Sequence, residues 1–157
     1  MNVIQIFAGR ASNGQVVHEE LPVRKIDDCT YELLASPGLA ENVAKGDLIR
    51  MHSSEAPVEI VRRGGNVCVQ MFVDGTLTPD ERTQIEQSFH STLQGSVDGQ
   101  TEQSMCFSIP VTVGFQSIEH FFNALSTANP SASWSYGNVY GVDGTTPLNW
   151  WSGNESD

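Results

Sequence analysis

A buried strand followed closely by a capped helix limits the fold of this 157-residue chain most strongly. Residues 67–73, Val-Cys-Val-Gln-Met-Phe-Val, form an apolar run typical of a central strand. Residues 78–81, Thr-Pro-Asp-Glu, combine an N-cap threonine, a proline at the first helical position and a glutamate three residues after the cap, which is a capping box. Ile85, Phe89 and Leu93 then supply an apolar helix face. The segment therefore predicts a strand packed against a helix.

The remainder of the second half repeats this pattern. Residues 95–103 form a predicted polar loop, residues 105–113 a strand, and Ser117 the cap of a second helix. The apolar positions of that helix follow helical spacing: Ile118, Phe121, Phe122 and Leu125. Residues 132–142 form a predicted last strand, on which aromatic residues share one face: Trp134, Tyr136 and Tyr140. The order predicts a split βαβ, or ferredoxin-like, layer with two helices on one side.

The first half contains short β-like runs and no helical pattern. The runs cover residues 3–8, 16–26, 30–35, 47–52 and 57–62. Asn13-Gly14 is a hairpin signal between the first two runs. The fold class is therefore α+β, with an N-terminal antiparallel sheet or small, partly open barrel before the ferredoxin-like layer.

The length fits one domain, residues 1–157, with one continuous core. A division into subdomains 1–65, which is β-rich, and 66–157, which has the βαβαβ order, is the alternative. The pair Gly64-Gly65 fits a joint between two such parts, and a hairpin turn explains this pair better than an anion-binding loop does.

Negative charge is concentrated in the C-terminal part of the chain. Residues 1–65 hold nine acidic and seven basic residues, whereas residues 66–157 hold ten acidic residues and Arg82 as the single base, and the net charge is −11. Such a surface repels phosphate backbones and anionic headgroups. We therefore expect no binding to nucleic acid or membranes, and faster association with a cationic protein. From the charge alone, solubility is the preferred explanation.

Acidic and aromatic residues of this half are the candidate contacts for a partner. The candidates are Glu86, Asp98, Glu102, Glu119, Asp143, Trp150 and Trp151. Tryptophan is enriched at binding hot spots, and an adjacent pair near a polar terminus must either pack onto the sheet or meet a partner. Asp80 and Glu81 are excluded from the set because a helix N-terminus accounts for them.

The sequence contains no pattern that predicts catalysis. His18-Glu19-Glu20 lacks the second histidine of a zinc-protease helix, and a solvated strand face explains it. Cys68 and Cys106 lie in apolar strand runs, where small buried hydrophobes are expected, and Arg62-Arg63-Gly64-Gly65 lacks phosphate-loop spacing. We expect a protein that is not an enzyme and has no catalytic residue, cofactor or metal site.

The start of the chain and its cysteines predict a cytoplasmic location. Residues 1–7 carry no basic n-region, so they predict a strand and neither a signal peptide nor a membrane span. The three cysteines are widely spaced and odd in number, which favours reduced thiols.

Several short motifs resemble an uncharacterised bacterial family, the domain-of-unknown-function family 4265. They lie at residues 30–33 (Thr-Tyr-Glu-Leu), Pro37, residues 43–47 (Val-Ala-Lys-Gly-Asp), residues 64–67 (Gly-Gly-Asn-Val) and residues 134–136 (Trp-Ser-Tyr). Members of this family look similar to proteins encoded beside secreted bacterial toxins. The resemblance therefore implies an immunity protein.

Our leading hypothesis is a cytoplasmic immunity protein that neutralises a cognate bacterial toxin, a cationic domain, by direct binding. The physical argument is that a toxin acting on anionic substrates needs a basic site, which an acidic protein can occupy. A small-molecule-binding regulatory module is the alternative, because ferredoxin-like sheets commonly bind ligands on an open face. An enzyme with an unrecognised site is the third hypothesis.

Overall fold

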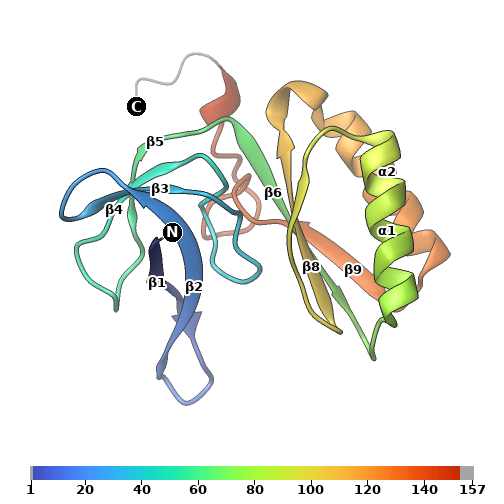
Figure 1. Ribbon diagram of the computed structural model, residues 1–157, viewed down its shortest axis with the longest axis horizontal. Coiled ribbons are helices and arrows are strands. Elements are labelled where there is room, and N and C mark those ends of the chain that lie inside the picture. Colours follow the sequence, from blue (N-terminus) through green and yellow to red (C-terminus); the bar gives the residue numbers. More distant parts are fainter. Residues whose placement is uncertain (1, 153–157) are drawn as a thin grey trace.

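The computed structural model describes residues 2–152, which form two antiparallel sheets (Figure 1). The first sheet is a meander in the order β1-β2-β3-β4-β5. Its strands are β1 (Asn2–Arg10), β2 (Val16–Lys25), β3 (Thr30–Leu33), β4 (Leu48–Arg50) and β5 (Glu59–Arg62). All five predicted runs are strands. Because β1 and β5 remain the two edges, the sheet agrees with the partly open form of the prediction.

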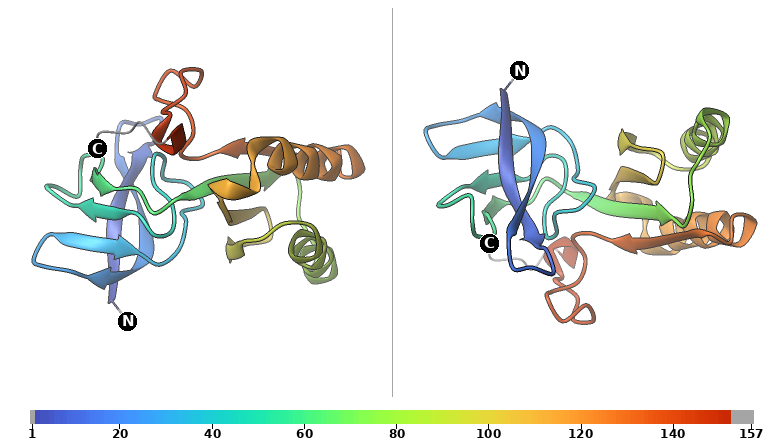
Figure 2. Two further views of the ribbon diagram at one scale, coloured as in Figure 1. Left: turned by 90° about the horizontal axis from the view of Figure 1, so that it is seen from above. Right: turned by 90° about the horizontal axis from the view of Figure 1, so that it is seen from below.

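The second sheet has the order β7-β8-β6-β9 and carries both α-helices. Its elements are β6 (Asn66–Val73), α1 (Pro79–Thr92), β7 (Ser96–Gln100), β8 (Ser104–Pro110), α2 (Phe115–Ala128) and β9 (Ala132–Tyr136), with short 3-10 helices η1 (Val111–Val113) and η2 (Trp150–Ser152). The order of elements and the antiparallel pairing of β6 with β8 and β9 are those of a ferredoxin-like layer, as predicted. In Figures 1 and 2 the helices cover the face turned away from the first sheet.

The predicted capping box begins α1. The Thr78 side chain accepts a hydrogen bond from the Glu81 backbone N–H at 3.1 Å, and the Glu81 carboxylate accepts one from the Thr78 N–H at 2.8 Å. Two otherwise unpaired N–H groups of the helix start are thus satisfied. Within residues 2–152, no helix is long and apolar enough to cross a membrane.

Four details of the second half differ from the sequence prediction. The strand predicted over residues 105–113 ends at Pro110, and residues 111–113 form the 3-10 helix η1. The predicted loop at residues 95–103 contains strand β7, whose polar sequence Ser-Val-Asp-Gly-Gln gave no apolar signal. The start of α2 is Phe115, with Gly114 at the cap position, so Ser117 lies inside the first turn and caps nothing. The last strand ends at Tyr136 and not at residue 142, because the chain leaves the sheet after β9.

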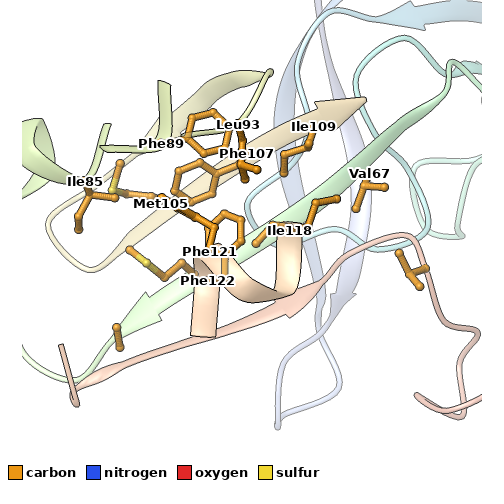
Figure 3. Close-up of a cluster of buried hydrophobic side chains, with 14 of the residues drawn as sticks. Val67, Ile85, Phe89, Leu93, Met105, Phe107, Ile109, Ile118, Phe121 and Phe122 are labelled. Carbon is orange, nitrogen blue, oxygen red and sulfur yellow. The ribbon is translucent and has the colours of Figure 1, made fainter. Parts of the chain in front are cut away.

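The core of the second sheet is built from aromatic residues of both helices and of β8 (Figure 3). Phe107 of β8 lies 4.9 Å from Phe89 of α1 and 5.0 Å from Phe122 of α2, measured between ring centroids. Each of these side chains is fully buried. Burial of one such ring contributes about 1.5–3 kcal/mol, so this cluster anchors the helices to the sheet.

A separate hydrophobic cluster lies inside the first sheet. Its buried members are Ile6, Leu21, Val23, Leu33, Ala40, Val43 and Ile49. The expectation of one continuous core is therefore wrong for the described residues, which bury two apolar clusters. The contact between the two sheets is made by polar groups instead.

Candidate functional site

The contact between the sheets is a polar layer formed by β6, β8 and residues 34–47. Strand residues alternate between faces, so Gln70 of β6 and Ser108 of β8 point away from the helices. The Gln70 side chain donates to the carbonyls of Pro37 and Ala40, at 3.2 and 2.9 Å. The Ser108 hydroxyl lies 2.6 Å from that of Ser36. This face of the ferredoxin-like sheet is thus occupied by the chain's own 34–47 segment.

Two carboxylates hold this segment in place. Glu19 accepts hydrogen bonds from the backbone N–H groups of residues 38, 39 and 40, at 2.6, 3.0 and 2.8 Å. Asp98 accepts from the Ser36 N–H at 2.7 Å and from the hydroxyls of Ser96 and Ser108. Glu19 therefore has a structural role, and its prediction as part of a solvated strand face is wrong. Its side chain satisfies a bend that has no regular hydrogen bonds of its own.

A cavity of about 440 Å³ beside these carboxylates brings together His18, Glu19, Asp98 and Cys106. Burial, reinforced by the charges of Asp98 and Glu19, raises the pKa of the Cys106 thiol to about 12. The neighbouring Cys68 is fully buried, which also raises its pKa. A nucleophilic cysteine requires the opposite shift, so these thiols remain protonated at neutral pH. Their prediction as small buried residues is confirmed.

The connection from β5 to β6 joins the two sheets at a close backbone contact. A Cβ atom on Gly64 would lie 2.3 Å from the Gly46 carbonyl carbon. Asp47, which is 1% exposed, accepts hydrogen bonds from the N–H groups of Gly64 and Ala44 at 2.8 and 3.0 Å, and its carboxylate lies 3.5 Å from Arg63. Burial raises the pKa of Asp47 to about 6, although these contacts favour the charged carboxylate and act to lower the pKa.

This geometry corrects the interpretation of Gly64-Gly65 as a hairpin turn. The flanking strands β5 and β6 belong to different sheets, and the glycines allow the chain to pass between them. The two motifs at residues 43–47 and 64–67 lie in contact there, since the Asn66 side chain also donates to the Lys45 carbonyl at 2.8 Å. We refer to residues 43–47 and 63–66 as the sheet junction.

The predicted partner contacts on the β7 side lie in different environments. Glu86 of α1 is half-buried and accepts a hydrogen bond from the Gln100 side chain at 3.5 Å. Asp98 is used in the polar layer, on the face of the sheet opposite the helices. Glu102 is exposed in the turn between β7 and β8. Of these three acids, only Glu102 has no side-chain contact described in residues 2–152.

The other two predicted acids lie on the β9 side of the sheet, one on α2 and one in the segment that follows β9. Glu119 of α2 accepts a hydrogen bond from the Tyr136 hydroxyl of β9 at 2.9 Å. Asp143 holds a turn by accepting from the N–H groups of Thr145 and Thr146 at 3.0 and 2.9 Å, and these bonds lower its pKa to about 2. The structure therefore spreads the five predicted acids over both edges and both faces of the second sheet. The remaining C-terminal acids, Glu155 and Asp157, lie outside the described residues.

The two predicted aromatic anchors pack onto the protein. Trp150 is 8% exposed, and its indole N–H donates to the Asn138 carbonyl at 2.8 Å. The guanidinium of Arg63 lies 5.7 Å from the Trp150 ring centroid, which ties the C-terminal segment to the sheet junction. Trp151 stacks edge-on against Phe115 of α2, with 4.9 Å between ring centroids. Of the two alternatives for this pair, the structure shows packing.

An apolar groove that the sequence did not indicate lies beside the first sheet. Its volume is about 570 Å³. It is lined by residues 6–9 of β1, by residues of the 39–43 bend, by Pro57 and Val58, and by residues of the 140–148 segment. Figure 2 shows this last segment, in red, running from β9 to the side of the first sheet. Four distant parts of the chain thus form one concave surface.

Large hydrophobic side chains remain exposed at this groove. Leu39 is 48% exposed, Tyr140 is 41% exposed, and Val142 is fully exposed. Among the described residues that line the groove, Glu41 is the one with a charged side chain. A concave apolar surface with exposed hydrophobic residues and an acidic rim is typical of a binding site. Among residues 2–152, no three His, Cys, Asp or Glu side chains are grouped so that they could hold a metal ion.

Comparisons with known proteins place the chain in a family and support its fold. No match was found among curated proteins. A crystal structure of a hypothetical protein from Neisseria gonorrhoeae is similar, with a TM-score of 0.64 at 14% identity, and the match covers 86% of this chain and 92% of that one. At this identity the likeness concerns the fold alone. Residues 19–133 match the family described as Domain of unknown function (DUF4265), and the chain therefore belongs to that family.

Proposed function

We propose that this protein is a non-enzymatic binding protein that engages a cationic protein partner through its apolar groove. The observation that supports this most directly is the exposure of Leu39, Tyr140 and Val142 around one concave surface. Monomeric proteins bury most such side chains, and a contiguous exposed set marks an interaction surface. The net charge of −11 favours a basic partner, because complementary charge speeds association.

The most specific form of this proposal is a cytoplasmic immunity protein that neutralises a cognate bacterial toxin. A toxin that acts on an anionic substrate carries a basic surface, and both the charge and the apolar groove suit such a domain. The five acids predicted as partner contacts do not gather on one face, so we no longer propose them as the contact surface. They are Glu86, Asp98, Glu102, Glu119 and Asp143. The groove, with Glu41 at its rim, takes their place.

Affinity capture with matched variants tests the proposal. Val142→Ser removes an exposed apolar side chain from the groove. Ile26→Ser is the control, because Ile26 is 43% exposed but does not line the groove. Neither substitution changes the charge. We expect a basic protein to be captured from lysate of the source cell by wild type and Ile26→Ser, and roughly tenfold less by Val142→Ser, because burying a valine contributes about 1.5 kcal/mol or more.

Purification of the captured protein and measurement of its toxicity complete the test. Co-expression of the wild-type chain should restore growth of cells that express this partner. The proposal is wrong if wild type captures no more of any basic protein than Val142→Ser does, and if deletion of the gene leaves the sensitivity of the cells to toxins of competing strains unchanged.

A small-molecule-binding module is the second candidate, favoured by the groove volume. About 570 Å³ lies within the roughly 300–1,000 Å³ range of ligand sites. Of the three aromatic residues predicted to share one face of the last strand, Trp134 and Tyr136 do not line this groove. Trp134 packs 5.5 Å from Phe122, and Tyr136 bonds to Glu119, whereas Tyr140 alone lines the groove. A metabolite that co-purifies with wild type and not with Val142→Ser would favour this candidate.

A further inference from the structure

The groove runs along the free edge of β1. Residues Ile6, Phe7, Ala8 and Gly9 are consecutive, and all four line it. Side chains of consecutive strand residues point to opposite faces of a sheet. Ile6 and Phe7 keep this alternation and pair in register with β2, whereas the register shifts between Phe7 and Arg10, so the groove follows the edge of β1 across a β-bulge. That edge is unpaired in the described sheet, because β1 pairs with β2 alone.

The opposite wall of the groove belongs to the other edge of the same sheet. Pro57 and Val58 lie immediately before β5, whose first residue is Glu59. The groove is thus the opening between β1 and β5 of the partly open barrel, and we call it the seam. Pro57 has no backbone N–H to donate to a neighbouring strand. The N–H and C=O groups of β1 that point away from β2 therefore face the seam. They can form hydrogen bonds with the backbone of another strand.

The seam is apolar between its walls and acidic at its rim. Ile6, Val43 and Val58 belong to the apolar cluster of the first sheet or pack against it, and they form part of the lining. Glu41 lines the groove and is exposed, and Val142, which also lines it, is fully exposed. An extended segment lying here would meet apolar groups on its inner face and the Glu41 carboxylate on its outer face. Alternating apolar and basic residues fit this arrangement.

We propose that the seam binds an extended segment of the cationic partner, with alternating basic and apolar residues, which adds to β1 as a sixth strand. This inference rests on the proposed function and specifies how the partner binds. The main-chain hydrogen bonds to β1 supply affinity, and the apolar residues of every second position enter the groove. The basic residues face Glu41 at the rim.

A synthetic peptide of alternating lysine and valine, seven residues long and blocked at both ends, is the probe. Amide chemical shifts of the full-length protein are recorded during its titration. We expect saturable changes at residues 6–9, 39–43 and 140–148. A peptide in which glutamate replaces every lysine should bind roughly tenfold more weakly or worse, because it places like charges beside the acidic rim.

Two N-methylated peptides distinguish strand addition from simple apolar contact. One carries N-methyl groups on the lysines, and the other on the valines. Alternate residues of an added strand donate to β1, so one of the two peptides should lose roughly tenfold or more in affinity while the other binds like the parent. Val142→Ser protein should weaken the parent peptide, and Ile26→Ser protein should not.

The inference is overturned if the parent peptide produces no saturable change at millimolar concentration. Shifts that cluster on α1 or α2 would equally refute it, as would equal binding of both N-methylated peptides. Each of these results leaves affinity capture of a basic partner by the groove unaffected, so the proposed function and the strand-addition mode fail separately.

Discussion

Asp47 at the sheet junction should make the protein less stable as the pH rises from about 4 to about 6. The carboxyl group is 1% exposed, and burial raises its pKa from 3.8 to about 6. Its contacts with the Gly64 and Ala44 N–H groups and with Arg63 favour the charged form and reduce this shift without cancelling it. In the folded state the proton is therefore held more tightly than in the unfolded state.

The sign and size of the effect follow from this difference in pKa. Between the two values the folded state binds more protons than the unfolded state, so the free energy of unfolding falls with increasing pH. The difference between a pKa of 3.8 and one of about 6 corresponds to about 3 kcal/mol, as an order of magnitude. The contribution is fully present below pH 4, is lost progressively up to about pH 6, and changes no further above that pH.

Asp47→Asn removes this titration while keeping the shape of the side chain. We expect the difference in unfolding free energy, wild type minus variant, to decrease by about 3 kcal/mol between pH 4 and pH 7. Urea unfolding followed by tryptophan fluorescence at half-unit pH intervals measures it, with equal m-values as the check on two-state behaviour. Asp143→Asn is the matched control, because Asp143 has a pKa of about 2 and titrates below this range. Parallel stability curves for wild type and Asp47→Asn would refute the reasoning.

The remaining predictions concern the sheet junction and the two helix starts. Gly64→Ala should destabilise the protein by more than about 2 kcal/mol in urea unfolding, since its Cβ would lie 2.3 Å from the Gly46 carbonyl carbon. Gly38→Ala, whose nearest contact is 3.6 Å, should cost much less, and equal losses would contradict the geometry. Thr78→Ala should cost about 1 kcal/mol in thermal unfolding, whereas Ser117→Ala should be nearly neutral because it caps nothing.

Local patterns in the sequence predicted most of the elements correctly. The capping box fixed the start of α1, and alternating or β-branched runs located β1 to β6. Strand β7 was missed because Asp98 and Gly99 oppose strand formation in isolation. Its stability comes from pairing with β8 and from the Ser36 N–H, which lies 62 positions away and bonds to Asp98. Tertiary contacts of this kind leave no local signal.

The groove was beyond sequence reasoning for the same reason. Its walls come from four segments between residues 6 and 148, and none of them carries a recognisable motif. The exposed Val142 lies in a turn rich in Gly and Thr, where a single hydrophobic residue forms no pattern that predicts exposure or binding. By contrast, Trp150 and Trp151 were candidate contacts for a partner because of their residue type, but they pack against Asn138 and Phe115. Side-chain type indicates binding only when its exposure is known.

The structure also changes the meaning of the negative charge. Glu19, Asp47, Asp98 and Asp143 each accept a backbone hydrogen bond within the chain, and Asp27 does so in the turn before β3. These carboxylates hold bends and turns that lack regular pairing, so they are not available as direct contacts for a partner. They still contribute to the long-range field wherever they remain ionised. For the basic partner that we propose, the charge favours association, whereas local shape must set the position of binding. In the described chain, the seam beside β1 has that shape, because it combines an unpaired strand edge with exposed apolar side chains.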